Sequence, residues 1–145
     1  MATNARSDPY RNYRFRVEIE GIQVAGFSDV SGYDMSINVV EYREGNEVIT
    51  PRKLPGLRKH SNITLKKGTT DSMDLFNWIK NVSDGKVERK SVTIISIDEE
   101  GKDSATWQVI NSWPVKYALS ELKGTGNDVL IETLELAHEG MTRTK

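Results

Sequence analysis

The stretch YREGNEVITPRKLPGLRKH, residues 42–60, connects two segments in which apolar and polar residues alternate as they do in β-strands. These segments are residues 35–44 and 62–66, and we expect them to pair as an extended hairpin with residues 45–60 as its loop. Hairpin loops usually have only about two to five residues. A connection this long is therefore expected to have a function of its own.

Basic and aliphatic residues share this loop. They are Arg52, Lys53, Arg58, Lys59, Val48, Ile49, Leu54 and Leu57. The basic residues, with Tyr42 beside them, would suit a nucleic-acid contact, but stacking of bases requires several exposed aromatic residues, and the loop contains none. Four exposed aliphatic residues favour packing against another protein, with the basic residues setting the orientation. We interpret residues 45–60 as an inter-subunit arm.

The rest of the chain is expected to be β-rich with one helix. Alternating or β-branched patterns predict strands at residues 14–20, 24–32, 91–97, 106–117 and 129–140. The inward residues are expected to build the core. They are Phe15, Val17, Ile19, Ile37, Ile63 and Leu65.

The helix is expected after residues 70–72, which offer N-cap candidates. Its apolar stripe is predicted to contain Leu75, Phe76, Ile79 and Val82. Trp78 lies off that stripe and becomes a candidate for an interface, whereas Trp107 and Trp113 are expected in the core or between subunits.

Composition limits the possible functions. The chain has 145 residues, no cysteine and a net charge of −1, which fits one domain over residues 1–145 without disulfides or cysteine-based metal sites. Two histidines, His60 and His138, are too few for a histidine metal site. No catalytic, phosphate-binding or dinucleotide-binding motif occurs, so we expect no enzyme activity, cofactor or metal. Neither a signal peptide nor a membrane anchor is expected.

An ordered set of motifs resembles one known family. The motifs are DPYRNYRFRVEIEG (8–21), AGFSDVSG (25–32), VVEYREG (39–45), LPGLRK (54–59), ITLKKG (63–68), LFNWI (75–79), WQVINSWPVKY (107–117) and IETLELAHEG (131–140). Together they resemble the tail tube proteins of contractile phages and, more closely, the inner tube proteins of extracellular contractile injection systems. The resemblance covers nearly the whole chain.

This resemblance implies a mainly β fold: a β-sandwich or half-barrel of two antiparallel sheets with one flanking α-helix. Such subunits form hexameric rings in which strands of neighbours join into one barrel around a channel, and the rings stack into a tube. The implied partners are further copies of the chain, a contractile sheath protein, baseplate and tube-terminating proteins, and protein cargo or nucleic acid in the channel. Assembly in the bacterial cytoplasm and release as an extracellular particle or virion tail are implied as well.

Polar faces of the long strands would then line the channel. The lumen-facing candidates are Ser36, Asn38, Asn62, Thr64, Lys66, Glu132 and Thr133. Glu132 and Glu135 have an odd spacing, so on a strand they point to opposite faces and make a poor acid–base pair. The alternative from a different class is a monomeric β-barrel that binds nucleic acid or a small ligand.

Overall fold

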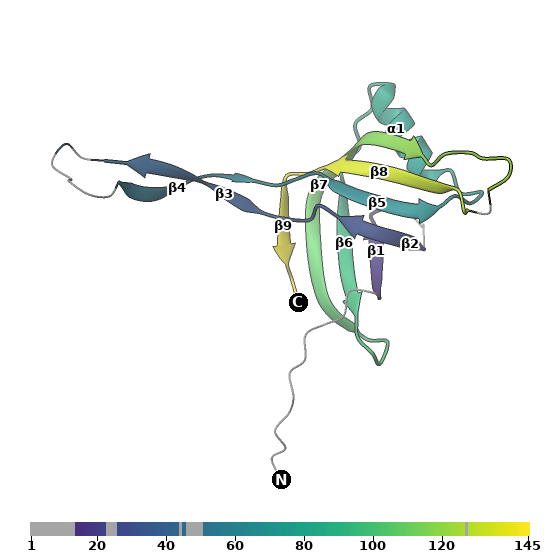
Figure 1. Cartoon of the computed structure of the whole chain (residues 1–145), viewed down its shortest axis with the longest axis horizontal. Coiled ribbons are helices and arrows are strands. Elements are labelled where there is room, and N and C mark those ends of the chain that lie inside the picture. Colours follow the sequence, from purple (N-terminus) through teal and green to yellow (C-terminus); the bar gives the residue numbers. More distant parts are fainter. Residues whose placement is uncertain (1–13, 23–25, 44, 46–50, 127) are drawn as a thin grey trace, which may run out of the picture.

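The computed structural model describes residues 14–22, 26–43, 45, 51–126 and 128–145. The first half of the chain contains β1 (Phe15–Ile19), β2 (Phe27–Ser31), β3 (Ser36–Tyr42), β4 (Arg52–Lys59) and β5 (Ile63–Gly68). The second half contains α1 (Asp74–Ser83), β6 (Lys90–Ile97), β7 (Asp103–Leu119), β8 (Ile131–Ala137) and β9 (Gly140–Arg143). Figure 1 shows a β-rich body flanked by α1, with a long hairpin extending from it. The predicted fold class is confirmed.

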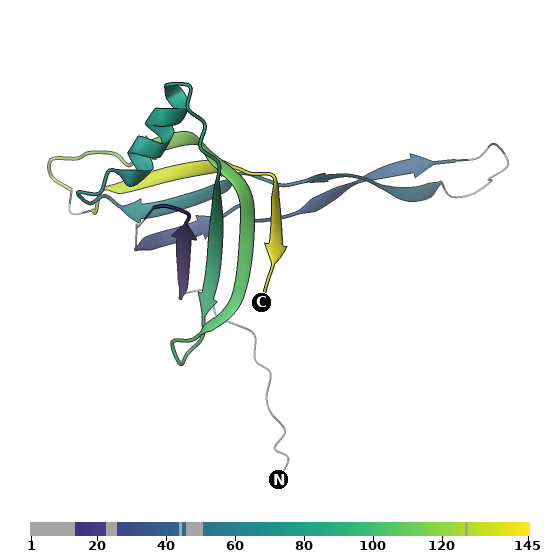
Figure 2. The ribbon, with the colours of Figure 1, turned by 180° about the vertical axis from the view of Figure 1, so that it is seen from behind.

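The body has two antiparallel layers that share the long strand β7 (Figure 2). In the first layer β1, β6, β7 and β9 are neighbours, and in the second β7, β8, β5 and β2 follow one another. β7 passes between the layers near Asn111, which has a φ of 52°, and Pro114, where its register with β8 shifts. Such irregularities suit proline because it has no N–H for the ladder.

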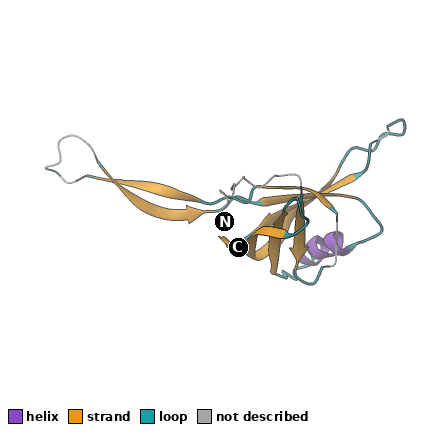
Figure 3. Ribbon diagram, turned by 90° about the horizontal axis from the view of Figure 1, so that it is seen from below, coloured by secondary structure: helices purple, strands orange, loops and turns teal. Residues whose placement is uncertain are grey.

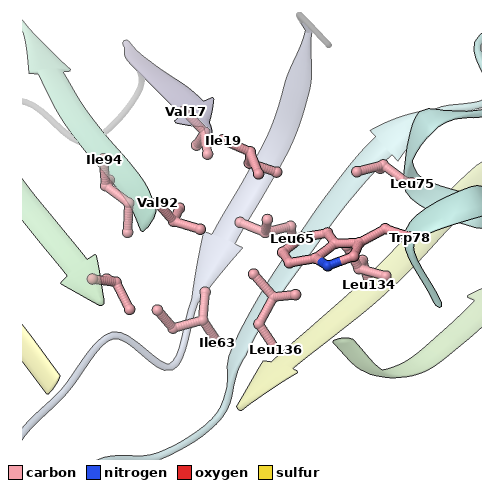
Figure 4. Close-up of a cluster of buried hydrophobic side chains, with 11 residues drawn as sticks. Val17, Ile19, Ile63, Leu65, Leu75, Trp78, Val92, Ile94, Leu134 and Leu136 are labelled. Atoms are coloured by element: carbon pink, nitrogen blue, oxygen red, sulfur yellow. The ribbon is translucent and has the colours of Figure 1, made fainter. Parts of the chain in front are cut away.

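The hydrophobic core lies between the layers and beneath α1 (Figure 4). On β5 and β8 every second side chain points inward, so Ile63, Leu65, Leu134 and Leu136 are buried as the alternation predicts. One expected core residue is misplaced. Ile37 is 52% exposed because β3 leaves the body.

Trp78 on α1 is buried, whereas the sequence predicted that it would lie at an interface. The buried residues of the helix are Leu75 and Trp78, which are three positions apart and therefore share a face. Trp78 Nε1–H donates a hydrogen bond of 2.8 Å to the carbonyl oxygen of Glu88, so the indole is anchored in the core and cannot serve as an interface residue. Phe76, expected on the apolar stripe, is exposed instead and contacts Tyr117 edge-on.

Strand pairing also differs from the expectation. β3 pairs with β4, whereas β5 pairs with β2 and β8. The single strand expected at residues 129–140 is two strands, since the chain turns at His138 and Glu139 and β9 then pairs with β7. Alternation predicts that a segment is a strand, but it does not choose among several possible partners.

Candidate assembly surfaces

Strands β3 and β4 form a two-stranded hairpin, called the arm below, that extends far from the body (Figure 3). Every residue of β3 is exposed, and in β4 all but Gly56 are exposed. An isolated two-stranded hairpin is at best marginally stable in water. The arm therefore lacks the packing partners that a stable two-stranded sheet requires.

Apolar side chains occupy both faces of the arm. Residues directly opposite each other in a sheet share a face, which places Val40 with Leu54 on one face and Val39 with Pro55 on the other. The exposed fraction reaches 62% for Val39 and 78% for Leu57. Exposed apolar surface of this kind marks a contact site for another protein. A hairpin that is apolar on both faces suits insertion between two surfaces.

Pro55 and Gly56 made β4 look like a loop in the sequence. In the structure they lie within the strand, where proline is tolerated on an edge. A Cβ on Gly56 would lie 2.9 Å from the carbonyl oxygen of Asn38, so the close approach of the two strands requires glycine. The expectation that residues 45–60 form a loop is therefore wrong for β4.

The basic residues of the predicted arm are exposed along β4. They are Arg52, Lys53, Arg58 and Lys59. The two strands carry one carboxylate, that of Glu41 on β3, which lies opposite Lys53. Because there are four basic residues and one acidic residue, positive charge predominates on the two strands. Val48 and Ile49, the other aliphatic residues predicted for the contact, lie outside the described residues.

Hydrogen bonds to backbone atoms attach the arm at its root. The His60 Nδ1–H donates to the carbonyl oxygen of Asp34 at 3.2 Å, and Ser61 N–H donates to Asp34 Oδ1 at 3.1 Å. His138 Nδ1 accepts from Gly140 N–H at 3.2 Å, so its Nε2–H donates to the carbonyl oxygen of Ser61 at 3.0 Å. These bonds help to set the direction in which the arm leaves the body.

The second layer turns a polar face away from the core. Lys66 lies opposite Thr133 on this face, and Thr64 lies opposite Glu135. Asn62 Nδ2–H donates to Glu135 Oε1 at 3.3 Å. The structure thus brings together four of the predicted lumen residues on neighbouring strands, and it adds Glu135 to them.

Three other lumen candidates are not part of this polar face. Ser36 and Asn38 are exposed on β3 and therefore belong to the arm. Glu132 is only 4% exposed and points into the core, because it shares the inward face of β8 with Leu134 and Leu136. A side chain buried in the subunit cannot line a channel, so the prediction for Glu132 is wrong.

Glu132 belongs to a buried polar cluster instead. Its Oε1 forms an ion pair with Lys67 Nζ at 3.3 Å, without the alignment of a hydrogen bond, and the two side chains are 4% and 2% exposed. Glu132 Oε2 accepts a hydrogen bond from the Tyr117 hydroxyl. Lys67 Nζ–H donates to Gly68 O at 3.3 Å and to Thr70 Oγ1 at 3.4 Å. Each buried charge thus has a partner, as burial requires.

Tyr117 makes the folded state sensitive to alkaline pH. Burial raises the pKa of Tyr117 from 10.0 to about 12, and the hydrogen bond to Glu132 and its charge act in the same direction. The pKa of Tyr117 is higher in the folded than in the unfolded protein, so the neutral phenol stabilises the folded state. This contribution to the unfolding free energy is complete below pH 10.0 and is lost as the pH rises to about 12. We expect the unfolding free energy to fall over this range, as measured by urea denaturation. Tyr117→Phe should remove that part of the pH dependence, and an unchanged profile would contradict the assignment.

The described residues contain neither a metal-binding cluster nor a helix that could span a membrane. No group of three or more His, Cys, Asp or Glu there could hold a metal ion. No helix in the same part of the chain is long and apolar enough to cross a membrane.

The sheet of the body is open. β1 has β6 as its neighbour, β2 has β5 and β9 has β7, and within the described part of the chain no strand pairs with their other edges. Unpaired edge groups are ready to accept a further strand, and closure of a sheet into a barrel removes them. The open edges of the sheet and the exposed arm therefore give the molecule several surfaces that can contact other chains.

Comparison with known proteins identifies the family. The sequence model of the T4-like virus tail tube protein gp19 matches residues 11–142 of the chain. The chain belongs to this tail tube family. Among proteins with curated descriptions, none matches its sequence significantly. The resemblance found in the sequence motifs is confirmed.

Solved structures of extracellular contractile injection systems contain similar chains. One from the PVC sheath–tube complex in the extended state is 31% identical, with a TM-score of 0.84 over 94% of this chain and 91% of that one. One from the anti-feeding prophage tube-terminating cap is 29% identical, with a TM-score of 0.88 over 99% and 96%. One from the anti-feeding prophage baseplate, solved with 6-fold symmetry, is 25% identical, with a TM-score of 0.81 over 95% and 97%. The tail tube fold therefore extends over nearly the entire chain.

Proposed function

We propose that this tail tube protein is a non-enzymatic subunit of the inner tube of an extracellular contractile injection system or a contractile phage tail. Six copies form a ring, and rings stack into a tube with a central channel. The arm carries this proposal, because its exposed apolar faces require surfaces that its own body does not provide. The 6-fold symmetry of the related baseplate supports the number of copies.

Ring formation uses the open edges of the body. A head-to-tail contact between the edge strand of one copy and that of the next closes when the rotation returns to the first copy. Pairing the free edge of β1 or β2 with a strand of the next copy removes that exposed edge at every contact around the ring. Strands of neighbouring subunits then form one continuous barrel.

The polar face of β5 and β8 lines the channel. Lys66 and Glu135 place opposite charges among the hydroxyl groups of Thr64 and Thr133, so the wall attracts neither sign of charge strongly. Protein cargo or nucleic acid can pass along such a wall without being held. A contractile sheath surrounds the tube, baseplate and tube-terminating proteins bind its ends, and the particle is assembled in the bacterial cytoplasm.

The alternative, a monomeric β-barrel that binds nucleic acid or a small ligand, has less support. Base stacking needs a platform of exposed aromatic residues. On the two strands of the arm, Tyr42 is the single aromatic residue among aliphatic ones. The exposed apolar surface of the arm fits another protein better.

Electron microscopy of the purified protein tests the proposal. We expect rings with a central hole, and stacks of rings at higher protein concentration, in negatively stained images. Light scattering should show a mass several times that of the 16.4 kDa chain. A protein that remains monomeric at micromolar concentration and binds DNA in a strongly salt-dependent way would contradict it.

A further inference from the structure

Two half-buried histidines lie against each other where the arm meets the body. The ring centroids of His60 and His138 are 5.2 Å apart, and the rings are tilted by 56°. His60 directly follows β4, and His138 lies in the turn between β8 and β9. These are the two histidines of the chain, so a change of imidazole charge between about pH 5 and pH 8 arises at this place.

The hydrogen bonds of His138 require its neutral form. Its Nδ1 accepts from Gly140 N–H at 3.2 Å, and its Nε2–H donates to the carbonyl oxygen of Ser61 at 3.0 Å. A protonated imidazole has N–H groups at both nitrogens. Proton uptake therefore sets Nδ1–H against Gly140 N–H, and the ring has to turn away. His138 then releases Ser61, the residue next to His60 at the end of the arm.

His60 adds a second effect in the same direction. Its Nδ1–H donates to the carbonyl oxygen of Asp34 at 3.2 Å, which links the two ends of the arm to each other. When both rings are protonated, two positive charges with centroids 5.2 Å apart repel each other. The repulsion moves His60, and with it the end of β4, away from His138.

Other charged groups lie on the segments around the pair. They are Asp34, Arg58, Lys59, Glu135 and Glu139. The three carboxylates have other partners: Asp34 accepts from Ser61 N–H, Glu135 from Asn62 Nδ2–H, and Glu139 from Asn111 Nδ2–H at 2.7 Å. Glu139 also lies 3.9 Å from Arg89 Nε. Arg58 and Lys59 make the end of β4 basic, so the repulsion acts on a segment that is already positive.

Packing contributes little to the direction of the arm, which extends away from the body (Figure 3). A groove of about 450 Å³ lies between the start of the arm and β9, with Met35, Leu57, Ile110 and Met141 among the residues that line it. All of β3 is exposed, and so is all of β4 except Gly56. The direction of the arm therefore depends on the hydrogen bonds at its root.

We propose that His60 and His138 form a pH-sensitive joint: the neutral pair holds the arm in one direction, and proton uptake releases it. The attached arm requires neutral His138, so attachment is complete at neutral pH and is lost as the pH falls. Assembly through the arm is then favoured at neutral pH and lost in mild acid. This consequence rests on the proposed function, whereas the joint itself does not.

Distances between two spin labels in one chain test the joint, because the chain has no cysteine of its own. One label is attached to Leu57→Cys on the arm, 78% exposed, and the other to Lys102→Cys on the body, 76% exposed. Labelled chains are mixed with an excess of unlabelled chain, so that each distance is measured within one copy. Pulsed electron paramagnetic resonance is recorded at about pH 8 and about pH 5.5, on either side of histidine titration.

We expect a narrow distance distribution at neutral pH and a broad one in acid. His138→Gln should keep the narrow distribution at both pH values, because glutamine stays neutral and has both a donor and an acceptor. Glu139→Gln is the matched control: it changes the neighbouring carboxylate, leaves both histidines and should still broaden in acid. An unchanged wild-type distribution would overturn the inference, and so would acid broadening that persists in His138→Gln.

A second label pair reports on the body. Val87→Cys lies on the connection between α1 and β6, and its distance to Lys102→Cys should stay narrow at both pH values. Broadening of this pair as well would mean that acid loosens the whole body, which overturns the inference. If His138→Gln does not fold, the wild-type chain with the two label pairs still decides.

Sedimentation tests the consequence for assembly. Wild-type tubes should be lost in mild acid, and His138→Gln tubes should persist. Tubes of the wild type that persist while the arm distances broaden would show that the joint does not control assembly. A wild-type chain that forms no rings or tubes at either pH would overturn the proposed function, and the label distances would still test the joint.

Discussion

A chain in which residues 36–59 are replaced by a short Gly-Asn turn is expected to fold and to lose tube formation completely. The buried core residues lie on other elements, so the body keeps its packing. The cut ends are close together, because Ser36 and Lys59 lie opposite each other and His60 Nδ1–H donates to the carbonyl oxygen of Asp34 at 3.2 Å. Tube formation is expected to be lost because the deletion removes exposed apolar surface that the proposed tube would bury between subunits. Near-ultraviolet circular dichroism reports the fold, and sedimentation with electron microscopy reports the tubes.

A matched control shortens a different exposed turn. Residues 98–102 connect β6 and β7, and replacing Glu99 and Glu100 by a single glycine removes charged residues without removing apolar surface. This variant is expected to form tubes like those of the wild type. Tubes of normal length from the armless chain would show that the arm is not needed for tube formation.

The second large effect concerns the buried ion pair. Lys67→Met leaves the carboxylate of Glu132 buried without its cation, and removing one partner of a buried pair costs about 3–5 kcal/mol of unfolding free energy. We expect the urea midpoint of Lys67→Met to fall sharply. Replacing both partners, Lys67→Met with Glu132→Gln, removes both charges and keeps an acceptor for the Tyr117 hydroxyl, so most of the loss should be recovered.

An exposed pair provides the control for this experiment. Lys102 Nζ lies 3.5 Å from Glu100 Oε2, and both side chains are 76% exposed. Lys102→Met is therefore expected to change stability by less than about 1 kcal/mol. If Lys67→Met and Lys102→Met had equal effects, the Lys67–Glu132 pair would have no special role in the stability of the body.

Much of the body was predictable from local patterns. Alternation identified β1 and β5, because one face of each strand packs on the core while the other does not, and β-branched or largely apolar segments identified most of β6 to β8. The same alternation contained a signal for the buried ion pair. Lys67 continues the inward series of Ile63 and Leu65, and Glu132 begins that of Leu134 and Leu136.

The arm was predicted in its location but not in its structure. Its aliphatic and basic residues pointed to a contact with another protein, and both kinds are exposed there. The Pro55-Gly56 dipeptide indicated a turn, and only the pairing with β3 makes it part of a strand. The predicted buried face of α1 was wrong for a similar reason. Both Phe76 and Trp78 are apolar and either could face the core, and in the folded protein Trp78 is the one that is buried.

The sequence by itself determined the β-rich class, the single helix and the family, because these depend on periodicity and on the order of motifs along the chain. Only the tertiary structure decided which strands are neighbours, that β4 leaves the body with β3, and that the connection between β7 and β8 lies at the end opposite the arm. Local patterns set which face of a segment avoids water, whereas partner choice depends on contacts between residues distant in the chain.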